Sequence, residues 1–143
     1  MSLNNYRVGL RIRCCKGVHP EVRRACLEFG RWLRKKRDFP MRVVIYLKKD
    51  ERIKNMNGEL VTATFFAPFD KANEPYIRIA TGDYDRLLKE CGKDNALAAY
   101  LRSIAHEIIH YKQWIRDYPL DESKANRESK DLIRRYAKTR LHP

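Results

Sequence analysis

The first half of the chain carries patterns typical of strands on either side of one helical segment. Polar and apolar residues alternate from residue 6 to residue 13, as in a strand with one buried face. Runs rich in β-branched and aromatic residues predict further strands at 41–47, 59–67 and 75–80. We expect a turn at Asn57-Gly58 to join the first two of these strands. Pro75 places the last near a sheet edge, because proline has no N–H for the ladder.

Three segments have the period of an amphipathic helix. Residues 20–37 have one apolar face, formed by Val22, Ala25, Cys26, Phe29, Trp32 and Leu33. A second helix should run from residue 95 to about residue 117, with Asp94 as its cap and Pro119 as its break. Its apolar residues are Leu97, Leu101, Ile104, Ile108 and Ile115. A third helix at 120–136 has a stripe made of Ala125, Ser129, Leu132, Ile133 and Tyr136.

These elements predict an α+β fold. The 143 residues are enough to bury about two-thirds of the unfolded surface, so we expect one domain over residues 1–143. With three or four strands ahead of the two last helices, the sheet should be mainly antiparallel, with the helices packed on one of its faces.

The second predicted helix contains His106-Glu107-Ile108-Ile109-His110, which has the form H-E-x-x-H. Positions i and i+4 of a helix share a face, so His106 and His110 can bind one metal ion. Glu107 lies at the edge of that face, where its carboxylate can reach a water bound to the same ion. Two imidazoles and a general base on one helical turn are typical of a zinc peptidase.

A catalytic zinc site normally takes three protein ligands, and the third must come from downstream of His110. Glu122 precedes Ala125 by three residues and should lie within the stripe of the last helix, where an unpaired carboxylate is costly. Glu128 is the alternative, because it can reach the level of His110, although it lies about 80° from the centre of the stripe. We favour Glu122.

The motif HEIIH, followed by Tyr111-Lys112-Gln113-Trp114 and then by Glu122-x-x-Ala125-Asn126, resembles the gluzincin metallopeptidases, and most closely their small minigluzincin-like members. This resemblance implies a zincin-like active-site helix, Zn²⁺ as the cofactor and Glu122 as a ligand on a "glutamate helix", with Ser129 at its small position. It also implies a substrate extended along an edge strand above the zinc helix, for which residues 74–81 are the candidate.

Two functions are therefore expected from the sequence. The first is a zinc metallopeptidase that hydrolyses peptide or protein substrates, with His106, His110 and Glu122 on the metal and Glu107 as the general base. The alternative is a catalytically silent binding module of the same fold. A net charge of +13 would allow that module to bind nucleic acid, but no nucleic-acid-binding motif accompanies the charge.

The cysteine spacing and the distribution of apolar residues bear on whether the chain has a second metal site, a membrane span or a secretory signal. Cys14, Cys15, Cys26 and Cys91 contain no C-x-x-C pair, so a second metal site with His19 is disfavoured, and Cys26 is expected in the core. No apolar run is long enough to span a membrane, and the N-terminus lacks the apolar segment of a secretory signal. We expect a cytoplasmic monomer without a membrane partner.

Overall fold

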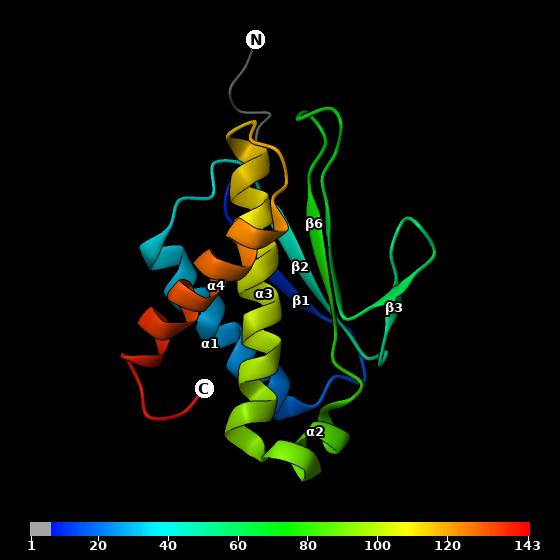
Figure 1. Ribbon diagram of the computed structural model, residues 1–143, viewed down its shortest axis with the longest axis vertical. Helices are drawn as coiled ribbons and strands as arrows, with labels where there is room; N and C mark the ends of the chain where they lie inside the picture. The colour runs from blue at the N-terminus through cyan, green and yellow to red at the C-terminus, as the bar shows by residue number, and fades with distance from the viewer. Residues whose placement is uncertain (1–6) are drawn as a thin grey trace.

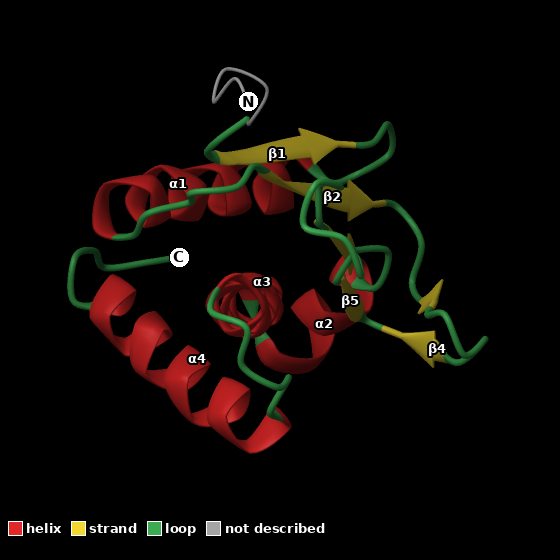
Figure 2. Ribbon diagram, turned by 90° about the horizontal axis from the view of Figure 1, so that it is seen from above, coloured by secondary structure: helices red, strands yellow, loops and turns green. Residues whose placement is uncertain are grey.

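The computed structural model describes residues 7–143 and contains helices on one side of a curved sheet (Figures 1 and 2). The strands are β1 (Leu10–Cys14), β2 (Val43–Lys48), β3 (Ile53–Lys54), β4 (Leu60–Val61), β5 (Ala63–Phe66) and β6 (Tyr76–Ala80). The helices are α1 (Pro20–Lys36), α2 (Tyr84–Cys91), α3 (Lys93–Ile115) and α4 (Glu122–Ala137). The predicted α+β class and the placement of the helices on one sheet face are confirmed.

The main sheet has the strand order β1-β2-β6-β5 and is mixed. Strands β1 and β2 are parallel, as are β2 and β6, and only β5 and β6 are antiparallel. The prediction of a mainly antiparallel sheet was therefore wrong. Helix α1 returns the chain across the sheet between β1 and β2, and a crossover of this kind gives a parallel pair.

Strand β6 lies inside the sheet, between β2 and β5, and not near an edge as predicted. Pro75 directly precedes β6, so its missing N–H removes no bond from the ladder. The edge strand beside α3 is β5 instead. The turn at Asn57-Gly58 exists, but it joins β3 to β4 in a separate two-stranded hairpin. The predicted strand at 59–67 is divided at Thr62 into β4 and β5.

Helix α3 passes through the middle of the molecule, with the sheet, α1, α2 and α4 around it (Figure 2). Leu97, Ile104 and Ile108 are buried against the core, and polar residues on other faces of the helix are buried as well. The predicted cap was wrong: α3 begins at Lys93 after Gly92, and Asp94 makes no capping hydrogen bond. Its carboxylate lies 2.8 Å from the His142 ring instead.

The other predicted helices agree closely with the structure. Helix α1 begins at Pro20 as expected, and Cys26 is buried in the core. Helix α4 begins at Glu122 after its cap Asp121, and Ala125, Ser129, Leu132 and Tyr136 of the predicted stripe are buried. Residues 1–6 lie outside the described residues; they include Tyr6, where the first predicted strand was to begin, and the first part of the segment that was assessed for a signal. Within residues 7–143, no helix has the length and apolar character needed to cross a membrane.

Candidate metal centre

The end of α3 directs the chain back over the H-E-x-x-H motif. Tyr118 N–H donates to the Gln113 carbonyl at 2.9 Å and Asp117 N–H donates to the Trp114 carbonyl at 3.1 Å, a pair of bonds that closes a helix with a left-handed residue. Asp117 is that residue, with φ of 58°. Helix α3 thus ends before Pro119, and only a short connection separates it from α4.

This reversal brings the first residue of α4 beside both histidines. Glu122 Oε2 lies 2.9 Å from His106 Nε2, and Glu122 Oε1 lies 2.8 Å from His110 Nε2. The two imidazole rings stand one turn apart on α3, with their centroids separated by 4.8 Å. One ligand atom from each of the three residues lies within 4.8 Å of the others, so the group could hold a metal ion.

The third residue of this group is the favoured Glu122 and not Glu128. Glu128 is exposed, and it lies close enough to Arg37 and Lys112 to affect their pKa values, away from the histidine pair. The reason given for Glu122 needs correction, however. Its side chain is 74% exposed, so it lies at the solvent edge of the helix pair and not within the packed stripe.

Gln113 fixes the orientation of His110. Its side-chain Nε2 donates to the Asp121 carbonyl at 3.2 Å, and its Oε1 accepts from the Asp121 N–H at 3.1 Å. With Oε1 identified as the acceptor, the nearby His110 Nδ1, at 2.9 Å, must carry the proton. The Nε2 lone pair of neutral His110 then faces the Glu122 carboxylate.

A lone pair and a carboxylate oxygen 2.8 Å apart repel each other unless a positive charge lies between or on them. A proton held by either of the two atoms, or a metal cation bound to both, removes this repulsion. The donor set of two imidazole nitrogens and a carboxylate is one that zinc commonly takes in catalytic sites. A hydrogen bond donated by the remote ring nitrogen, here from His110 Nδ1–H to Gln113 Oε1, is the usual support of such a ligand.

Glu107 is the titratable group most perturbed by its surroundings in this region. Its side chain is buried on α3, and burial raises its pKa to about 7. The His110 ring lowers this pKa, while the Glu122 carboxylate raises it. A carboxyl with a pKa near neutrality can both accept and release a proton under ordinary conditions.

Three of the four candidate residues, His106, Glu107 and Glu122, line one cavity of about 480 Å³. Thr62 and Ala63, at the start of β5, form another wall of it. The remaining lining residues come from α3 and α4: Ala99, Arg102, Ser103, Asn126, Ser129 and Lys130. Arg102 and Lys130 contribute two positive charges to the lining of the cavity.

The free edge of β5 runs past this cavity. Ala80 N–H donates to the Thr62 carbonyl at 2.8 Å, and β5 pairs with β6 in antiparallel register. Because bonded and non-bonded pairs alternate in such a ladder, the N–H and C=O groups of Ala63 and Phe65 point away from β6. They leave an edge to which an extended chain can bind.

Sequence reasoning missed the roles of Gln113 and of the β5 edge. Gln113 follows His110 by three residues, and this spacing is the signal that the two side chains can meet on the helix. The β5 edge carried no comparable signal, because strand order is not visible in a local pattern.

The cysteines form no second centre. Cys26 is fully buried, and burial raises the pKa of its thiol to about 12. The Nδ1 atom of His19 accepts a hydrogen bond from the Glu21 N–H at 3.0 Å, so this ring caps α1. In the part of the chain that the structure describes, His106, His110 and Glu122 are the group of potential metal ligands that comes together.

No protein-family model, no curated protein and no solved structure matches this chain.

Proposed function

We propose that this protein is a zinc-dependent metallopeptidase of the gluzincin type. The observation that carries the proposal is the convergence of His106, His110 and Glu122 on one point beside the buried Glu107. Two imidazoles and a carboxylate leave a fourth position for water, as catalytic zinc sites require.

Bound at this position, zinc would lower the pKa of a water molecule to near neutrality and polarise a substrate carbonyl. Glu107 would accept the proton of the attacking water and pass it to the leaving amine. Its burial supports this role, because a carboxyl with a pKa of about 7 is a competent base and also a competent acid. Gln113 would hold His110 with its Nε2 lone pair toward the metal.

The substrate would bind to the free edge of β5 as an additional strand. The expected strand at 74–81 does not fit this role, because β6 is paired on both sides. Backbone groups of Ala63 and Phe65 would bond the substrate main chain, which gives affinity without a strict sequence requirement. Arg102 and Lys130, in the same cavity, would favour acidic side chains in the substrate.

A test compares cleavage of a mixed peptide library by the zinc-loaded protein and by its Glu107→Gln variant. The amide keeps the size of the side chain and is not a ligand, so zinc content should stay at one equivalent. Cleavage should fall by about 10²–10⁴-fold, the usual loss for a missing general base. Glu128→Gln is the matched control, because it makes the same chemical change at an exposed position outside the cavity.

Equal cleavage by Glu107→Gln and wild type would refute the proposed mechanism. Absence of cleavage by the zinc-loaded wild type, on the library and on its own chain at high concentration, would favour the alternative of a silent binding module.

A further inference from the structure

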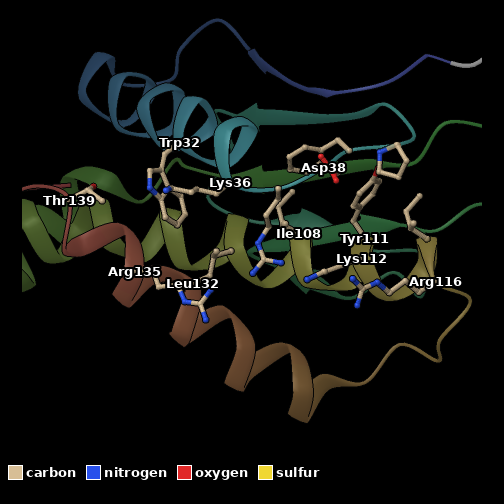
Figure 3. Close-up of a pocket in the computed structure, with 14 residues that line it drawn as sticks. Trp32, Lys36, Asp38, Ile108, Tyr111, Lys112, Arg116, Leu132, Arg135 and Thr139 are labelled. Atoms are coloured by element: carbon tan, nitrogen blue, oxygen red, sulfur yellow. The ribbon is translucent and has the colours of Figure 1, made fainter.

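A second cavity, of about 670 Å³, lies on another side of α3 and shares no lining residue with the metal centre (Figure 3). It is enclosed by the end of α1, the segment 37–40, the last turns of α3 and the second half of α4. Its volume falls in the range of about 300–1,000 Å³ that is typical of small-molecule sites.

The inner wall of this cavity is apolar and aromatic. Phe39, Ile108, Tyr111 and Leu132 contribute buried side chains, and Trp32 lines the cavity beside them. The indole Nε1 of Trp32 is buried and has no hydrogen-bond partner among the described residues.

The rim of the cavity is strongly basic. Of the residues that the structure describes, only Asp38 lines it with a carboxylate. Five cationic side chains line it as well: Lys36, Arg37, Lys112, Arg116 and Arg135. Within residues 7–143, only Arg135 of these five has an ion-pair partner within 4.0 Å, which is Asp131.

The positive charge on this rim is incompletely balanced. Burial lowers the pKa of the Arg37 guanidinium, and the charges of Arg135 and Arg116 lower it further. The Glu128 carboxylate opposes this effect in part. Cations held so close to one another gain from an added anion, because each would otherwise carry unrelieved repulsion.

We propose that this cavity binds a nucleotide, either free or at the end of a nucleic acid strand. The phosphates would bind the cationic rim, where arginine forks suit phosphate oxygens, and the base would lie against the aromatic wall. An inorganic anion alone would leave the apolar wall uncovered, and an uncharged ligand would leave the cations unpaired. A ligand that joins both chemistries satisfies the two parts of the cavity together.

Calorimetric titration of the zinc-loaded protein with ATP tests the proposal, with adenosine and inorganic triphosphate as partial ligands. ATP should bind at one equivalent, and each partial ligand at least tenfold more weakly. Arg37→Gln/Arg116→Gln should weaken ATP binding by at least about tenfold, since two charge-assisted contacts are lost. Lys54→Gln/Lys89→Gln is the matched control, because it removes two exposed positive charges outside the cavity and should change binding less than twofold.

A second titration, in which a 5′-phosphorylated oligothymidylate replaces ATP, decides whether the cavity binds a free nucleotide or the end of a nucleic acid strand. The ligand would be identified as a strand end if the oligonucleotide bound much more tightly than ATP and if Arg37→Gln/Arg116→Gln weakened both affinities by the same factor. Tryptophan fluorescence provides an independent readout of the site: the change caused by ATP should be lost in Trp32→Phe and kept in Trp114→Phe.

Three results would overturn the proposal. The first is no binding of ATP or oligonucleotide by a protein whose melting temperature shows it to be folded. The second is inorganic triphosphate binding as tightly as ATP, which would leave no role for the aromatic wall. The third is an equal loss of affinity in the control variant, which would mean that the overall positive charge, and not this cavity, attracts the ligand.

Discussion

Replacing Gln113 by alanine should weaken zinc binding although Gln113 is not itself a ligand. The side chain makes three hydrogen-bond contacts: one to His110 Nδ1 at 2.9 Å, and two to the backbone of Asp121 at 3.1 and 3.2 Å. Through them it orients one ligand directly and positions Glu122, the residue after Asp121. Loss of such outer-shell support typically costs about 10–100-fold in metal affinity.

The same substitution should also lower stability. Gln113 is 7% exposed, and alanine would leave polar groups of Asp121 and the His110 ring without their partner. Each buried polar group that loses its partner costs about 1–3 kcal/mol, but Asp121 is exposed and water can replace part of what is lost. We therefore expect a loss of about 1–3 kcal/mol in the free energy of unfolding of the metal-free protein.

The measurement is zinc affinity by competition with a chelating dye, together with urea unfolding of the metal-free protein. Gln113→Glu is informative, because its carboxylate still accepts from His110 Nδ1 and from the Asp121 N–H while losing the donated bond. It should retain more zinc affinity than Gln113→Ala. Asn95→Ala is the control, since Asn95 lies in the first turn of α3, far from the ligands, and its side-chain amide donates to the carbonyl of Cys91 at the end of α2.

The role assigned to Gln113 would be refuted if Gln113→Ala bound zinc within twofold of the wild-type affinity while His110→Ala no longer bound zinc. Equal loss in Asn95→Ala would attribute the effect to general weakening of α3.

Three further predictions follow from the geometry. Glu122→Ala should reduce zinc retention far more than Glu128→Ala, measured as bound metal after gel filtration, and the reverse order would assign the third ligand to Glu128. Zinc at 100 times its Kd should stabilise the wild type by about 2.7 kcal/mol in thermal unfolding, and His106→Ala should show almost none of this gain. A thiol reagent should label the exposed Cys91 rapidly and leave Cys26 unlabelled until the protein unfolds, because burial keeps that thiol protonated; fast labelling of Cys26 would contradict its place in the core.

Local patterns predicted the helices better than the sheet, for a physical reason. A helix closes its own hydrogen bonds between residues four apart, so the apolar spacing of 20–37 and 120–136 contains most of the information needed. Both segments are helical within about two residues of the expected bounds. A strand takes its bonds from a partner that no local pattern names, and the parallel pairing of β2 with β6 was consequently not foreseen.

The edge prediction failed at a single residue. Pro75 was taken as part of a strand, where its missing N–H would require a free edge. The strand begins one residue later, at Tyr76, so the proline lies outside the ladder and β6 is free to pair on both sides. A shift of one residue thereby moves the candidate substrate strand from β6 to β5.

The position of Glu122 shows what residue spacing along a helix can predict and what it cannot. The helical period placed Glu122 in register with Ala125, but the period cannot tell how far α4 extends beyond α3. In the structure Glu122 stands at the very start of α4, largely exposed, and reaches back to both histidines. The left-handed Asp117 and the Gln113–Asp121 contacts set that position. The ligand geometry thus depends on the connection between the helices, where one closing turn and one buried amide decide which carboxylate meets the histidines.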